Sequence, residues 1–137
     1  MVVTTFVHAA CTLAALWGLR MTHLGRWGLG SRWRRVSLVS ALVLLLFFAA
    51  LLEVGIWAAV YLMVGAISAL EPALYFSTVT FTTLGYGDVT LSEGWRLLAS
   101  FEAANGIILF GWTTALIFAV LRRLATHDES LVGKLSS

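Results

Sequence analysis

The stretch from Thr82 to Asp88 reads Thr-Thr-Leu-Gly-Tyr-Gly-Asp and lies between two apolar segments. Its two glycines, Gly85 and Gly87, alternate with residues that carry side chains. Glycine adopts left-handed backbone dihedrals at little cost, so the chain can change hand from one residue to the next. Successive carbonyl oxygens can then point the same way, and a row of them can replace the water around a dehydrated monovalent cation. The chemistry expected of this stretch is cation coordination by backbone oxygens.

The composition places this stretch in a membrane protein. Of the 137 residues, 60% are hydrophobic and 12% are charged, whereas charged residues make up about 25% of a typical soluble domain. Irregular backbone at membrane depth is tolerated only where it is buried in protein or lines a water-filled path. The Gly-rich stretch is therefore expected to line such a path.

A first membrane-spanning helix is predicted over 2–19, which contains no charged side chain and can nearly cross a hydrocarbon core of about 30 Å. A cleaved signal peptide is the alternative, but such a peptide carries positive charge before its apolar part, and residues 1–6 have none. The string at 9–11, Ala-Ala-Cys, hints at a lipoprotein cleavage site, although His8 stands where an aliphatic residue is wanted. We interpret His8 as a hydrogen-bonded packing residue, or one near the interface, rather than a proton relay.

The region from Arg20 to Arg35 is rich in Gly, Arg and Trp and is predicted to be a basic cytoplasmic loop. Its arginines do not recur every third residue on an apolar helix, which argues against a voltage sensor. We expect some of them to contact anionic lipid, namely Arg26, Arg32, Arg34 and Arg35. Residues 1–35 thus form one unit, with the amino terminus outside the cell.

A second spanning helix is predicted over 36–62. It is interrupted by Glu53, whose carboxylate costs a few kcal/mol if it faces lipid, so we expect it to face protein near the outer leaflet. Trp57 and Tyr61 are expected to mark the outer interface. Residues 63–70 are then a short connection.

Glu71-Pro72 is a typical helix start, with an acid near the positive end of the helix dipole and a proline that needs no amide donor. A helix over 72–82 is only about 16 Å long and can only half-cross a bilayer. Its carboxyl end then directs partial negative charge toward the membrane midplane, which favours a cation there.

A third spanning helix is predicted over 95–121, and it ends at Arg122 and Arg123 on the cytoplasmic side. It carries Glu102, a second carboxylate at membrane depth. The tail over 124–137 is short and polar and has no room for a nucleotide-binding or calcium-sensing domain. We expect the carboxyl terminus in the cytoplasm.

The string Thr83-Leu84-Gly85-Tyr86-Gly87-Asp88, with a short helix before it and spanning helices on both sides, resembles the pore-domain family of potassium channels, and in particular its short prokaryotic members. The resemblance covers about 36–123, with Leu84 where the family's filter commonly has valine. It implies an all-α membrane protein with the pore fold of outer helix, pore helix, filter and inner helix, plus one extra N-terminal transmembrane helix. It also implies a homotetramer, because one filter segment per chain cannot make a ring.

The resemblance further implies roles for individual residues. The expected K⁺ ligands are the backbone carbonyls of Thr83, Leu84, Gly85 and Tyr86, with the Thr83 hydroxyl as the innermost ligand and Gly87 completing the filter. Tyr75 is expected to contact Asp88 and so support the filter. The candidate hinge of the inner helix is Gly106, with Gly111 second, and close helix packing explains both glycines equally well.

Some members of that family place a glutamate on the pore helix behind the filter, but the matching position here is Val79. Our hypothesis is that Glu102 or Glu53 takes its place from a neighbouring helix. Its partners are then expected among Asn105, Arg96, Ser77 and Thr80. The alternative is a structural carboxyl that only fixes helix packing.

The resulting prediction is a potassium-selective channel of the cell membrane, with itself and lipids as partners and no cofactor beyond the permeant ion. Alternatives are a non-selective cation channel, a potassium transporter built from pore-loop repeats, and a non-conducting subunit that modulates a partner. The three His and single Cys have no metal-ligand spacing, and no phosphate loop or nucleophile elbow occurs, so neither an enzyme nor a nucleic-acid module is expected.

Overall fold

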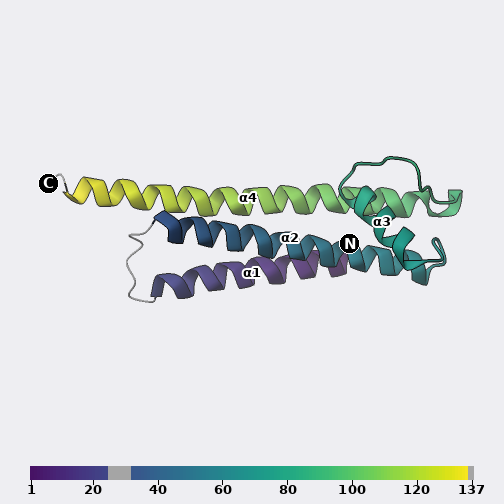
Figure 1. The fold of residues 1–137 in the computed structure, drawn as a ribbon, viewed down its shortest axis with the longest axis horizontal. Coiled ribbons are helices and arrows are strands. Elements are labelled where there is room, and N and C mark those ends of the chain that lie inside the picture. Colours follow the sequence, from purple (N-terminus) through teal and green to yellow (C-terminus); the bar gives the residue numbers. More distant parts are fainter. Residues whose placement is uncertain (25–31, 136–137) are drawn as a thin grey trace.

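The structure, a computed structural model, describes residues 1–24 and 32–135. In chain order its elements are the helices α1 (Val2–Leu24), α2 (Arg32–Met63) and α3 (Leu70–Phe81), the 3-10 turn η1 (Glu93–Trp95) and the helix α4 (Arg96–Leu135). The described part contains no strand. Figure 1 shows α4 along the whole length of the molecule, α2 and α1 beside it, and α3 at one end only.

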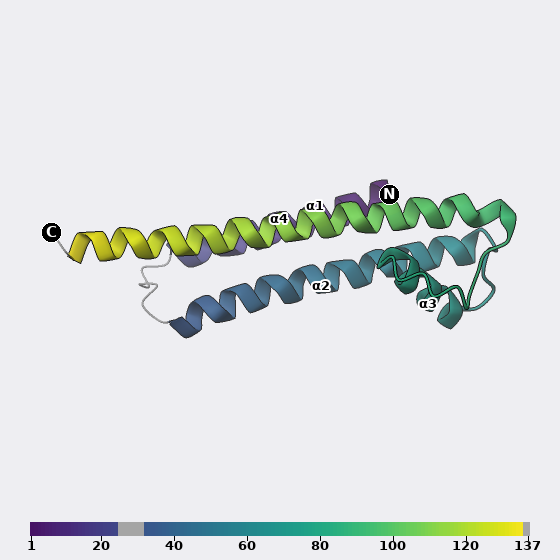
Figure 2. The same cartoon turned by 90° about the horizontal axis from the view of Figure 1, so that it is seen from above.

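Three stretches of helix are long and apolar enough to cross a membrane, Val2–Met21, Val36–Met63 and Glu93–Leu124. They agree with the three predicted spans. In contrast, α3 has only 12 residues, which at about 1.5 Å per residue is too short to cross. The described part of the chain is therefore all-helical, with three helices that could span a membrane and one short helix packed at one end of the bundle (Figure 2).

Several predicted boundaries are wrong, and in each case the helix is longer than expected. The helix α1 continues to Leu24 and α2 begins at Arg32, so the basic loop is shorter than 20–35. The helix α4 does not end near Arg123 but continues to Leu135. Charged residues end a membrane span without ending a helix, because Arg, Glu, Ala and Leu are all good helix formers in water.

The start of α3 also differs from the prediction by two residues. Ala69 is the extended residue before the helix, with φ −131° and ψ 148°, and no side chain caps the helix there. Pro72 is consequently the third helical residue, where its missing N–H is one of the amides without an intrahelical partner. Glu71 lies in the first turn and interacts favourably with the helix dipole.

The buried side chains form two clusters at opposite ends of the bundle. One surrounds α3 and joins it to α2 and α4; its members are Val54, Trp57, Tyr61, Phe76, Phe81, Leu91 and Leu109. The other joins α1, α2 and α4 and consists of Ala15, Leu42, Leu46 and Val120. We call these the α3 cluster and the aliphatic cluster. The α3 cluster includes Trp57 and Tyr61, so the prediction that these two aromatics mark the lipid interface is wrong: they pack inside the protein.

Candidate functional site

The Gly-rich loop alternates its backbone hand at every second residue. Thr83, Gly85 and Gly87 have φ of 60°, 59° and 79°, which places them in the left-handed region. This is the alternation that the two glycines suggested, extended by one residue to Thr83. A side-chain-bearing residue in that region costs about 1–3 kcal/mol, and such residues cluster at functional sites.

The loop is tied back to the end of α3 by backbone hydrogen bonds. The Thr83 N–H donates to the Thr80 carbonyl at 2.9 Å, and the Gly85 N–H donates to the Val79 carbonyl at 3.3 Å. Within a single subunit the loop residues 83–88 are exposed; Leu84 is 57% and Tyr86 68% accessible. An irregular loop within a membrane needs a further protein surface to cover it or a water-filled path to line.

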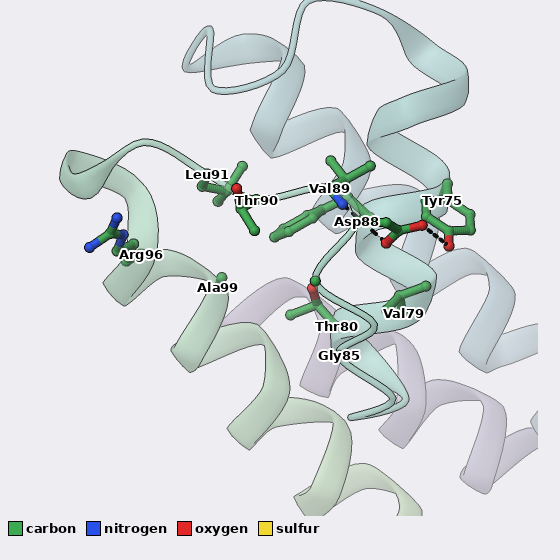
Figure 3. A pocket seen from close by; sticks show the side chains of 12 residues that line it. Tyr75, Val79, Thr80, Gly85, Asp88, Val89, Thr90, Leu91, Arg96 and Ala99 are labelled. Atoms are coloured by element: carbon green, nitrogen blue, oxygen red, sulfur yellow. Dashed lines mark hydrogen bonds between the residues drawn. The ribbon is translucent and has the colours of Figure 1, made fainter.

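A cavity of about 250 Å³ lies between the loop, α3 and the start of α4. Figure 3 shows Gly85 and Asp88 on the loop, Tyr75, Val79 and Thr80 on α3, and Arg96 and Ala99 on α4 around it. The loop is thus supported from one side by α3 and is open on the other.

Tyr75 and Asp88 make the contact expected from the sequence. The Tyr75 hydroxyl donates to Asp88 Oδ2 at 2.6 Å, and the Val89 N–H donates to Asp88 Oδ1 at 3.0 Å (Figure 3). The hydrogen bond from Tyr75 lowers the pKa of Asp88, and the same bond to Asp88 raises the pKa of Tyr75. The ionised carboxylate of Asp88 therefore joins the carboxyl-terminal end of the loop to α3 through this hydrogen bond.

Glu102 is fully buried behind α3. The Ser77 hydroxyl lies 2.5 Å from Glu102 Oε1, and the Tyr61 hydroxyl donates to Glu102 Oε2. Ser77 also lies 2.9 Å from the carbonyl of Val54. Side chains of α2, α3 and α4 thus meet at one carboxyl group, which holds α3 in place on the two long helices.

Of the four partners considered for Glu102, the structure brings Ser77 to it. Arg96 instead pairs with Glu93 at 3.5 Å, and Asn105 accepts a hydrogen bond from Thr4 at 2.7 Å. Tyr61 is the partner that sequence reasoning missed. Glu53, Trp57 and Tyr61 are spaced by four residues, which puts them on one helix face, and that spacing was the available signal that Tyr61 faces protein.

Glu53 lies in a second buried polar group, which joins α1 to the other helices. Glu53 faces protein, as expected, and its Oε1 lies 3.0 Å from His8 Nδ1, while His8 Nε2 lies 3.2 Å from Thr113 Oγ1. The His8 ring also packs edge-on against Trp112 at 5.6 Å. The interpretation of His8 as a hydrogen-bonded packing residue is confirmed.

Gly106 is a close-packing position. A Cβ added there would lie 2.0 Å from the carbonyl oxygen of Phe81, the last residue of α3. Nothing lies within 4 Å of a Cβ at Gly111. The helix α4 is continuous through both positions, and the hinge role stays a prediction.

The remaining predicted contacts concern the basic segment. Arg26 lies outside the described residues, and so do the side chains of Arg32, Arg34 and Arg35. Their contact with anionic lipid stays a prediction.

Comparison with known proteins gives one match. A family model described as an ion channel matches residues 49–123, more than half of the chain. The matched segment contains the second half of α2, all of α3, the Gly-rich loop and α4 as far as Arg123. No curated protein and no solved structure matches the chain.

Proposed function

Since this chain belongs to the ion-channel family, we propose that it is a potassium-selective channel whose filter is formed by Thr83, Leu84, Gly85, Tyr86 and Gly87 of four identical subunits. Family membership makes the chain an ion channel rather than an enzyme. Selectivity for K⁺ and assembly into a fourfold ring go beyond family membership and are what we propose here.

The observation that carries the proposal is the alternation of left-handed residues at 83, 85 and 87. This alternation lets consecutive carbonyls face one axis, as a filter made of backbone oxygens requires. One such loop offers a column of oxygens on one side of an ion, and four loops around an axis surround it. The exposure of 83–88 in the single subunit is what a segment at the centre of a ring would have before the other copies are added.

The orientation of α3 supports the same function. Its carboxyl end, at Phe81 and Thr82, leads directly into the loop. The carboxyl terminus of a helix carries about half a negative charge. Four such carboxyl termini around one axis would favour a cation on that axis. Glu71 stands at the opposite end, in the first turn.

We assign Glu102 a positioning role in this channel, since it acts on the filter only through α3. Its contacts with Tyr61 and Ser77 fix the helix from which the filter emerges. It thereby replaces, from α4, the carboxyl that some related channels carry on the pore helix.

In the membrane, we propose that residues 36–123 form the pore domain, that 1–35 add a peripheral helix and basic loop, and that 124–137 form a cytoplasmic tail. The amino terminus then faces outside, because Arg20 to Arg35 and the arginines after the third span lie on the same, cytoplasmic side. The basic residues Arg26, Arg32, Arg34 and Arg35 are proposed to contact anionic lipid.

Flux from purified protein in liposomes tests the proposal. We expect K⁺ efflux from loaded vesicles and, under bi-ionic K⁺ and Na⁺ conditions, a reversal potential that indicates a strong preference for K⁺. Equal permeability would leave a non-selective cation channel, and no flux would leave a modulatory subunit. Native mass spectrometry is expected to give the mass of four subunits, and a monomer would contradict the ring.

A pair of glycine substitutions links this flux to the loop. A Cβ at either Gly85 or Gly94 has nothing within 4 Å, but only Gly85 has a positive φ, of 59°. Within its own subunit, Gly85→Ala therefore acts through backbone conformation, at about 1–2 kcal/mol in each subunit. We expect Gly85→Ala to lose K⁺ selectivity or conduction and Gly94→Ala to retain both; equal behaviour of the two variants would count against the filter assignment.

A further inference from the structure

A groove between α1 and α4 is not used by the filter or by the buried polar groups. It encloses about 390 Å³. Thr4 and His8, in the first half of α1, contact α4 through hydrogen bonds, whereas the groove lies along the second half of α1, beside Leu16 and Arg20. The groove is therefore separate from these two contacts.

The lining of the groove is apolar with two guanidinium groups. The lining includes Leu16 and Arg20 of α1 and Leu116, Ala119 and Arg123 of α4. Leu16 and Arg20 are four residues apart, and Leu116, Ala119 and Arg123 follow one another at spacings of three and four, so on each helix these residues lie on one face. A ligand that fits must be apolar over most of its length and anionic at one place.

The two arginines lie at the ends of two stretches that could span a membrane. Arg20 is the last residue but one of the stretch Val2–Met21, and Arg123 is the last but one of Glu93–Leu124. The helices α1 and α4 run in the same direction through the bundle (Figure 1), so both arginines would lie at the same membrane surface. Leu16, Leu116 and Ala119 would then lie toward the hydrocarbon.

The groove lies on the side of α4 that faces α1. At 100° per residue, Ala119 lies on nearly the same side of α4 as Asn105, which contacts α1. The residues of the proposed filter, 83–87, are not among those that line the groove.

We propose that this groove binds one anionic phospholipid, with an acyl chain between α1 and α4 and the phosphate between Arg20 and Arg123. Basic pockets between transmembrane helices on the cytoplasmic side are suited to such headgroups. The bound lipid would bridge the peripheral helix and the inner helix of the channel. The site differs from the proposed lipid contacts of the basic loop, and it rests on the membrane placement of the helices, not on potassium selectivity.

Lipid retention by the purified full-length protein tests the proposal. Native mass spectrometry would be recorded with phosphatidylglycerol and with phosphatidylcholine of identical acyl chains. We expect about fivefold to tenfold tighter binding of one phosphatidylglycerol per subunit, and a loss of about that size in Arg20→Gln and in Arg123→Gln. Equal retention of the two lipids would overturn the proposal.

Two variants and one competitor separate this groove from general surface charge. Arg122→Gln removes the same charge one residue away, outside the lining, and is expected to retain the lipid. Ala119→Phe fills the apolar part and is expected to weaken binding of both lipids while thermal unfolding confirms an intact protein. A drop in Arg122→Gln as large as in Arg123→Gln, or unchanged binding in Ala119→Phe, would refute the site.

Soluble glycerol phosphate is expected not to displace the lipid, because it lacks the acyl chain. Displacement would mean that the headgroup alone binds and would overturn the role of the apolar lining. If neither lipid is retained and Ala119→Phe weakens the oligomer instead, a neighbouring subunit occupies the groove and the lipid proposal is overturned. Lipid binding is measured without conduction, so its failure leaves the proposed channel function intact.

Discussion

The two ends of the helix bundle are packed differently. Around α3 the fully buried side chains include large aromatics and a carboxyl with two partners, Tyr61, Phe81 and Glu102. At the other end the aliphatic cluster joins the helices, beside the groove between α1 and α4. Lipid is as apolar as leucine, so aliphatic contact alone drives helix association weakly in a membrane.

The difference indicates where this protein needs a single geometry. Close packing and hydrogen bonds within a low-dielectric interior specify one arrangement, whereas aliphatic side chains tolerate sliding. At the end of the bundle that holds the Gly-rich loop, packing and hydrogen bonds therefore specify a single geometry. Substitutions there should cost more than comparable substitutions at the other end.

The largest effect is expected from Gly106→Ala. Its Cβ would lie 2.0 Å from the Phe81 carbonyl, and since neither backbone yields easily, α3 must move from α4 at a cost of about 3 kcal/mol. We expect loss of the assembled channel on native mass spectrometry and loss of K⁺ flux. Gly111→Ala is the matched control on the same helix, since within the subunit its Cβ meets nothing within 4 Å; a defect as severe in Gly111→Ala would contradict the contact between α4 and α3 as the cause.

Next in size is Glu102→Ala, which leaves the buried hydroxyls of Tyr61 and Ser77 without their carboxyl partner. The unsatisfied Tyr61 hydroxyl costs about 1–3 kcal/mol, whereas the Ser77 hydroxyl can still donate to the Val54 carbonyl. Thermal unfolding of the purified protein in detergent should show a clear loss of stability, accompanied by reduced flux.

Glu102→Gln is a milder form of the same test. The amide can accept from Tyr61 and donate to Ser77, so we expect assembly to survive and single-channel open probability to change. An unchanged open probability would assign Glu102 to helix packing alone and end its positioning role at the filter.

A smaller effect is expected from His8→Ala, which separates α1 from Glu53 and Thr113. Interhelical hydrogen bonds in membranes are worth about 0.6–2 kcal/mol, and this group lies on α1, outside the α3 cluster. We expect a modest fall in thermal stability with K⁺ selectivity retained. Loss of selectivity in this variant would mean that α1 contributes to the geometry of the filter, and it would contradict the expected difference between the two ends of the bundle.

The smallest effect is expected from Tyr75→Phe, which removes an exposed hydrogen bond. Tyr75 lowers the pKa of Asp88, so the contact stabilises the loop above the ordinary pKa of an aspartate and is lost as pH falls through the lowered value. Acid on the outer side should therefore reduce conduction at a higher pH in Tyr75→Phe than in the wild type. Asp88→Asn should abolish this difference. Identical pH profiles for wild type and Tyr75→Phe would contradict a role of the Tyr75–Asp88 hydrogen bond in holding the loop.

The membrane-spanning elements and the Gly-rich loop could be predicted from the sequence because each depends on local properties. Runs without charge must cross the bilayer as helices, and a Glu-Pro pair followed by only twelve residues before two spaced glycines specifies a short helix and an irregular loop. The left-handed residues at Gly85 and Gly87 follow from the same pattern. The end of α4 was missed because charge marks the membrane surface and not the end of a helix.

Which groups meet inside the bundle was decided only by the tertiary structure. A helix that is apolar all round does not indicate which face is buried, so the sequence left Tyr61 at the lipid interface and offered four partners for Glu102. Packing of α3 between α2 and α4 placed Tyr61 and Ser77 on that carboxyl and brought Gly106 close to Phe81. Packing of α1 against α2 joined His8 to Glu53 across 45 residues of chain. These contacts depend on how the four helices rotate about their own axes, and the rotation is set by the shapes of facing side chains that lie far apart in the sequence.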